Sequence, residues 1–130
     1  MAQRNANPKP TDAELEILRV LWRQGPATVR QVCEALNRDR IVGYTTVLKL
    51  LQIMTDKGLV TREYVEQRAH VYAARASEEY AQRRMVKDLL DRVFDGSAQK
   101  LVLHALTAKK ASAEELAQLR RLLDELEGEL

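Results

Sequence analysis

Cysteine and long apolar runs are almost absent from this sequence, and each absence excludes a class of protein. The one cysteine, Cys33, cannot form an internal disulfide. No stretch approaches the roughly 18 apolar residues that cross a membrane, and no apolar stretch follows the N-terminus. We therefore expect a cytoplasmic protein that does not insert into a membrane.

Aromatic residues, at 5%, and glycines, at five, are scarce as well, which favours helices over a β-sandwich or barrel. The sequence has no His-Glu-x-x-His, no phosphate-binding loop, no nucleophile elbow and no glycine-rich dinucleotide turn. Its two histidines are far apart, and with Cys33 they do not make a zinc site. We expect neither an enzyme nor a bound metal or cofactor.

Charge is distributed unevenly along the chain, although the formal net charge is only +2. Residues 1–76 hold 12 Lys and Arg against 8 Asp and Glu, a net charge of +4, whereas residues 77–130 hold 9 against 11, a net charge of −2. A basic first half fits a nucleic-acid-binding module joined to a second part. Ordinary solvated surface charge is the alternative. The charge distribution does not distinguish the two, so the choice depends on the pattern of the helices.

Residues 43–64 carry the most informative pattern of the chain. Apolar residues recur at i, i+3, i+4 and i+7, which predicts one buried helical stripe made of Val47, Leu50, Leu51 and Met54. Short polar groups and a cation fall on the other side, at Thr45, Thr46, Lys49 and Gln52. Lys57-Gly58 ends the helix, and an alternating run over 59–64 then predicts a strand. A helix followed directly by a two-stranded ribbon is typical of a winged helix-turn-helix.

The segments before this helix complete such a module. Residues 1–10 have no periodicity and predict a flexible arm. Capping boxes at Thr11-x-x-Glu14 and Thr28-x-x-Gln31 open two helices. Their expected inward residues are Leu15, Leu18, Leu21 and Trp22 in the first, and Val29, Val32, Cys33 and Leu36 in the second. After the strand, a polar turn at 66–68 leads to a returning strand at 69–74, so residues 11–76 form the predicted winged domain.

Residues 77–130 are helical in pattern. One stripe, closed by Asp95-Gly96, comprises Val86, Leu89, Leu90, Val93 and Phe94. Ser97 caps a short second helix, and a third capping box at Ser112-x-x-Glu115 opens a seam of Leu116, Leu119, Leu123 and Leu126. These helices have little to bury against except one another and a second copy. We therefore predict a helical dimerisation domain, with helices folding back in a monomer as the alternative.

Three blocks of this sequence together resemble the penicillinase-repressor family of bacterial regulators, the group of BlaI, MecI and CopY. They are TDAELEILRVLW from Thr11, YTTVLKLLQIMTDKGLV from Tyr44, and R-x-H-V-Y over 68–72. The likeness extends from residue 11 to about 127. It implies a mostly α protein with a small β wing, in which a winged helix-turn-helix precedes a helical dimerisation domain. It also implies a dimeric repressor on a palindromic DNA operator.

The resemblance also implies site residues. Thr45, Thr46 and Lys49 match the exposed start of the recognition helix, which would enter the major groove N-terminus first. Arg62, Arg68 and His70 match wing positions near the DNA backbone. The alternatives are helix capping for the threonines, a solvated side chain for Lys49 and the arginines, and a buried or backbone-bonded wing histidine for His70. For Cys33 an inert buried thiol is favoured over a redox switch.

The sequence differs from the family in the motifs that serve induction, the release of the repressor from DNA. The copper-responsive branch carries paired C-terminal cysteines, which this chain lacks. In antibiotic-responsive members a membrane-bound sensor with a zinc-protease domain triggers cleavage of an Asn-Phe bond, and the matching place here reads His104-Ala105. Two routes of release stay open, proteolysis and the binding of a small ligand. A winged-helix module that docks a partner protein is the rival function.

Overall fold

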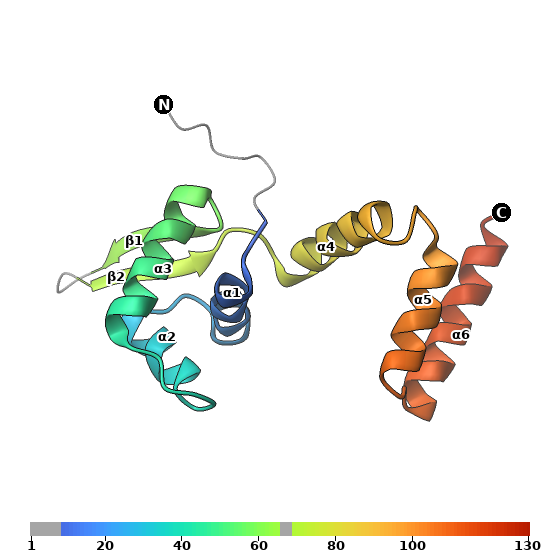
Figure 1. Ribbon diagram of the computed structural model, residues 1–130, viewed down its shortest axis with the longest axis horizontal. Coiled ribbons are helices and arrows are strands. Elements are labelled where there is room, and N and C mark those ends of the chain that lie inside the picture. Colours follow the sequence, from blue (N-terminus) through green and yellow to red (C-terminus); the bar gives the residue numbers. More distant parts are fainter. Residues whose placement is uncertain (1–8, 66–68) are drawn as a thin grey trace. The chain divides into compact units, whose positions relative to one another are not determined.

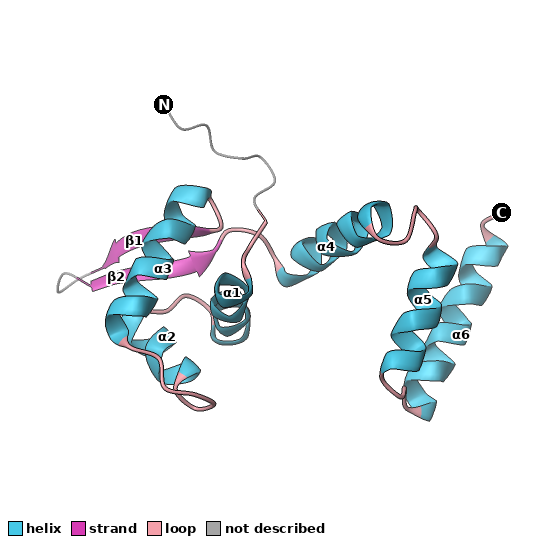
Figure 2. Cartoon of the chain, viewed as in Figure 1, coloured by secondary structure: helices cyan, strands magenta, loops and turns pink. Residues whose placement is uncertain are grey.

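The computed structural model describes residues 9–65 and 69–130 and confirms the predicted fold class (Figures 1 and 2). Its elements, in chain order, are α1 (Asp12–Gln24), α2 (Val29–Leu36), α3 (Tyr44–Lys57), β1 (Val60–Val65), β2 (Ala69–Ala74), α4 (Glu78–Arg92), α5 (Ala98–Ala108) and α6 (Ala113–Gly128). The chain divides into two compact units, Met1–Arg83 and Arg84–Leu130. The predicted domain boundary at residue 76 stays a prediction, and the predicted arm lies outside the described residues except for its last two.

Side-chain caps start the helices as the sequence predicts. The Thr11 hydroxyl accepts from the Glu14 backbone N–H at 3.2 Å, and Glu14 accepts from the Thr11 N–H at 2.9 Å. The same reciprocal box opens α2 between Thr28 and Gln31, and opens α6 between Ser112 and Glu115. Each box satisfies two backbone donors that the helix itself leaves unpaired.

The hydrophobic core lies between α1, α2, α3 and the two strands. Its buried side chains are Ile17, Leu18, Leu21, Ala27, Val29, Val32, Leu36, Val47, Leu51, Met54, Val60 and Tyr72. The stripes predicted for α2 and α3 are confirmed, with Cys33 and Leu50 only partly buried. On α1 the prediction is confirmed for Leu18, Leu21 and Trp22 and wrong for Leu15, whose place in the core is taken by Ile17. Glu14 and Ile17 are buried and Leu15 is half-buried, because the face that meets α3 is turned toward residues 14, 17, 18 and 21.

Trp22 lies at the edge of this core and is partly buried against it. Its indole Nε1 donates to the carbonyl oxygen of Ala76 at 3.0 Å. The predicted core role is therefore confirmed, and the tryptophan also fixes the chain segment that leaves β2.

Strands β1 and β2 form the antiparallel wing, in the register Val60↔Ala74 to Val65↔Ala69. Tyr72 is buried and exchanges two backbone hydrogen bonds with Ala27, of 2.8 and 2.9 Å, so the α1–α2 connection borders the ribbon. This pairing holds the wing against the helices. The predicted turn at 66–68, which includes Arg68, lies outside the described residues.

The second unit and the helix leading to it keep their apolar residues near the surface. No residue of α4, α5 or α6 is fully buried. Of the predicted dimerisation residues, four are exposed, namely Leu89, Val93, Leu123 and Leu126. Three are half-buried, namely Leu90, Leu116 and Leu119. The Phe94 and His104 rings lie 5.8 Å apart between centroids and connect the end of α4 to α5.

Candidate nucleic-acid interface

Helix α3 separates its side chains into a buried and an exposed face. Val47, Leu51 and Met54 are 0% exposed, whereas Thr45, Thr46, Lys49 and Gln52 are all exposed. The helix ends at Gly58, which has a left-handed backbone with φ 83° and ψ 16°. The division predicted from the spacing is confirmed, and it gives the winged unit a polar, solvent-facing helix surface.

The two threonines do not cap α3. Gly43 is the N-cap and makes no side-chain cap, so the capping alternative for Thr45 and Thr46 is wrong. Within residues 9–65 and 69–130, neither threonine hydroxyl nor the Lys49 ammonium has a hydrogen-bond or ion-pair partner. These side chains are therefore available to groups outside the chain.

The wing residues lie beyond the core on β1 and β2. Arg62 and His70 are exposed. The His70 ring forms a T-shaped contact with the ring of Tyr64, its cross-strand partner. The ring centroids are 5.2 Å apart and the interplanar angle is 75°. The buried alternative for His70 is therefore wrong. The Tyr64 side chain, 64% exposed, belongs to the same wing face and was not singled out by the sequence.

The connection from α2 to α3 is held by one amide side chain. Asn37 Oδ1 accepts from the Val42 N–H at 2.7 Å, and its Nδ2 donates to the Val42 carbonyl at 3.0 Å. The same Nδ2 donates to the Cys33 carbonyl at 2.6 Å and contacts the Cys33 sulfur at 3.2 Å. The expected buried thiol is in fact partly buried, and it donates to the Val42 carbonyl at 3.3 Å. Asn37 thus fixes where α3 begins.

The far end of α3 is held by an ion pair. Lys57 Nζ lies 2.5 Å from Oε1 of Glu14, which is 2% exposed. Burial alone raises the pKa of the Glu14 carboxyl. The hydrogen bonds from Lys57 and Thr11 and the charge of Lys57 outweigh it, so the pKa lies below its usual value. Glu14 therefore stays ionised and ties the start of α1 to the end of α3.

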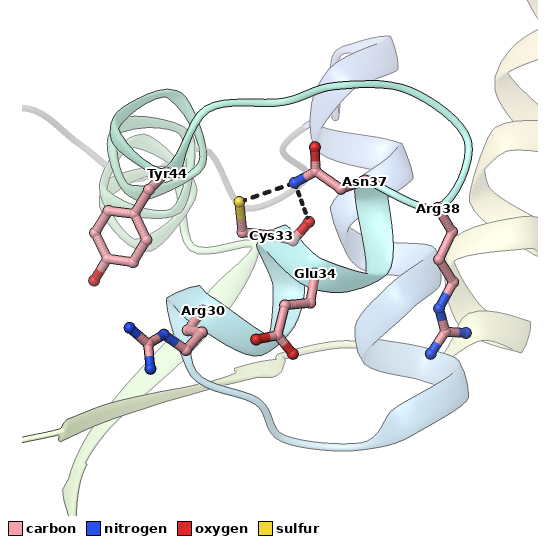
Figure 3. A pocket seen from close by; sticks show the side chains of 6 residues that line it. All are labelled: Arg30, Cys33, Glu34, Asn37, Arg38 and Tyr44. Carbon is pink, nitrogen blue, oxygen red and sulfur yellow. Dashed lines mark hydrogen bonds between the residues drawn. The ribbon is translucent and has the colours of Figure 1, made fainter.

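A surface hollow of about 420 Å³ lies between α2 and the start of α3 (Figure 3). Its lining residues are Arg30, Cys33, Glu34, Asn37, Arg38 and Tyr44. Arg30, Arg38 and Tyr44 are not among the site residues that the sequence predicts. The signal available for the charged residues was the four-residue spacing of Arg30, Glu34 and Arg38, of which the first two lie on the polar side of α2 and the third follows its end. Tyr44 gave none, because its place at the hollow depends on the α2–α3 connection.

Other kinds of site find no support in the described residues. Over 9–65 and 69–130, no group of three or more His, Cys, Asp or Glu side chains is placed to hold a metal ion. In the same part of the chain, no helix is both long enough and apolar enough to span a membrane.

Three helices, of which the third exposes a polar face, followed by a two-stranded ribbon, define a winged helix-turn-helix protein. The family model for the penicillinase repressor matches residues 10–125. The transcriptional regulator BlaI of Mycobacterium tuberculosis is 39% identical over 119 residues, covering 90% of this chain and 84% of that protein. The chain therefore belongs to the penicillinase repressor family, a family of transcriptional repressors and not of enzymes.

Two further similarities agree with this assignment. The penicillinase repressor of Bacillus licheniformis is 26% identical over 118 residues, covering 91% of each chain. The solution structure of the DNA-binding domain of the repressor BlaI aligns with a TM-score of 0.50 and 26% identity. That alignment covers 57% of this chain and 89% of the domain.

Proposed function

We propose that this protein is a dimeric, cytoplasmic repressor that binds a palindromic DNA operator through α3 and the wing. The observation that carries the proposal is the exposed face of α3, where Thr45, Thr46 and Lys49 have no partner within the described residues. These groups match what a major groove offers. Threonine contacts thymine methyls or phosphates, and lysine reaches a guanine edge or a phosphate.

In this proposal the wing contacts the DNA backbone. Arg62 and His70 are exposed, and Arg68 belongs to the predicted turn at 66–68, outside the described residues. Arginine contacts to phosphate fix the register of a protein on DNA without reading its sequence. The DNA-binding domain named in the BlaI solution structure supports this use of the fold.

Dimerisation is proposed to occur through the helices after the wing. The support is the number of large apolar side chains left in water there, among them Leu89, Val93, Leu123 and Leu126 at 40–64% exposure. A second copy would bury them, and a two-fold dimer would explain a palindromic operator.

For induction we propose proteolysis prompted by a membrane-bound zinc-protease sensor, with release by a small ligand as the alternative. The bond between His104 and Ala105 lies within α5, and both residues are exposed. Incubation of cells with inducing antibiotics, followed by mass measurement of the recovered repressor, separates the two routes. Fragments support proteolysis, whereas an intact chain that has left its DNA supports a ligand.

The test of the function is binding of the full chain to genomic DNA fragments, followed by footprinting of the selected site at several salt concentrations. A protected palindrome, with affinity that falls steeply as salt increases, is the expected result. A folded protein that selects no DNA at low salt would contradict the proposal and favour a protein-docking module.

A further inference from the structure

The hollow between α2 and α3 lies beside the proposed recognition face but does not belong to it. Tyr44, which borders the hollow, is the first residue of α3 and directly precedes Thr45. In Figure 3 Tyr44 and Arg30 lie toward one end, Arg38 lies toward the other, and Glu34 lies between them. A duplex that followed the start of α3 would therefore pass this hollow.

The charged groups of the hollow are not used inside the protein. Arg30, Glu34 and Arg38 are exposed, and in the described part of the chain none of their side chains has a hydrogen bond or ion pair. The Tyr44 hydroxyl has no such partner there either. The neighbouring Arg40 differs, because it is bound to Glu16 at 2.9 Å. Two guanidinium groups around one carboxylate leave a net positive charge at this surface.

The chemistry of these groups matches phosphate. A guanidinium group presents N–H donors in a planar fork that fits phosphate oxygens, and a phenol adds one neutral donor. We propose that the hollow holds the sugar-phosphate backbone of the strand beside α3. Arg30 and Arg38 bind its phosphates and the Tyr44 hydroxyl donates to one of them. The proposal rests on the proposed DNA-binding function.

Glu34 has the opposite effect in the same site. Its carboxylate lies between Arg30 of α2 and Arg38, which follows the end of α2, and it repels a phosphate that approaches them. The site is therefore weaker than its arginines allow, and removing this one negative charge strengthens DNA binding. Stronger DNA binding after removal of the Glu34 charge is expected for a phosphate site. It is not expected if these charges only pair with one another within the protein.

The experiment compares variants of the full chain by fluorescence anisotropy, with a mixed-sequence duplex and with the selected operator, at several salt concentrations. Arg30→Gln and Arg38→Gln should each weaken binding to both duplexes by the same factor. Each should also reduce the slope of log affinity against log salt by about 0.9, because one counterion fewer is released. Glu34→Gln should tighten binding to both duplexes.

Tyr44→Phe keeps the ring and removes only the hydroxyl. It should weaken binding roughly threefold and leave the salt slope unchanged, because a neutral donor releases no counterion. Arg19→Gln is the matched control, since it removes one exposed positive charge from the polar face of α1. Circular dichroism establishes that each variant is folded.

The outcomes distinguish this proposal from the function on which it rests. If the wild-type chain binds DNA but Arg30→Gln and Arg38→Gln behave like Arg19→Gln, the phosphate site is refuted and the repressor function stands. If the wild-type chain binds neither duplex at low salt, the function itself fails. If inorganic phosphate binds to the hollow while all variants bind DNA normally, the site holds free anions only and the proposal is overturned.

Discussion

Lys57, in the last turn of α3, is paired with Glu14 of α1 across 43 residues of sequence. Glu14 is almost fully buried, and the same carboxylate caps the first turn of α1. Removing the lysine would leave the buried carboxylate with Thr11 as its remaining hydrogen-bond partner. The pair therefore links the stability of the winged unit to the placement of α3.

Substitution Lys57→Met should lower the free energy of unfolding by about 2 kcal/mol, because an uncompensated buried carboxylate is costly. Urea denaturation of the full chain measures the change. Lys49→Met on the exposed face of the same helix is the control and should change stability by less than about 0.5 kcal/mol. Equal effects of the two substitutions would show that the Lys57–Glu14 pair makes no particular contribution to the free energy of unfolding.

The stability contributed by Glu14 should depend on pH. Since the pKa of Glu14 is lowered in the folded protein, the contribution is fully present above the value of 4.5 for an unperturbed carboxyl. It is lost as pH falls through the lower, folded-state pKa. The difference in unfolding free energy between wild type and Glu14→Gln should thus be constant near neutral pH and shrink below about 4.5. A difference that grows on acidification would contradict this assignment.

Lys49→Ala should weaken specific operator binding by about 1–3 kcal/mol if the lysine contacts a base. Titration of the selected operator measures the loss, and a mixed-sequence duplex shows whether it is specific. Lys100→Ala, which removes an exposed lysine from α5, is the control. Unchanged operator affinity would remove Lys49 from the contact set.

Replacing Leu119 and Leu123 of α6 together by Asp should shift the dimer toward monomer, because two carboxylates cannot be buried unpaired in an apolar interface. Sedimentation velocity measures the mass. Gln118→Asp with Arg121→Asp places the same two carboxylates at polar positions of the helix and should leave the mass unchanged. A dimeric mass for the leucine variant would place the interface elsewhere.

The sequence predicts those parts of the fold that depend on local pattern. Spacing alone identifies the buried stripe of α3, because Val47, Leu51 and Met54 recur with the helical period. On α1 the pattern predicts Leu18 and Leu21 correctly but selects Leu15 instead of Ile17, since both are apolar and only packing in the folded core decides between them. The burial of Glu14 was missed for the same reason, because its partner Lys57 is remote in sequence.

The residues of the candidate site likewise include some that a local pattern predicts and one that depends on the folded path of the chain. Periodicity places Thr45, Thr46 and Lys49 on an exposed face, whereas no pattern in the sequence assigns a role to Tyr44. Its position beside Arg30 follows from the path of the chain between Asn37 and Val42, which no short pattern encodes.

The side chain of Asn37 has a consequence for chemical ageing of the protein. Its oxygen accepts from one N–H while its nitrogen faces two carbonyls and a sulfur. Hydrolysis of this amide by water would release the nitrogen as ammonia and leave a carboxylate, whose second oxygen would face the carbonyl oxygens of Cys33 and Val42. This exchange of one side-chain nitrogen for oxygen, a change of about one mass unit, would thus release the connection that sets the first turn of α3.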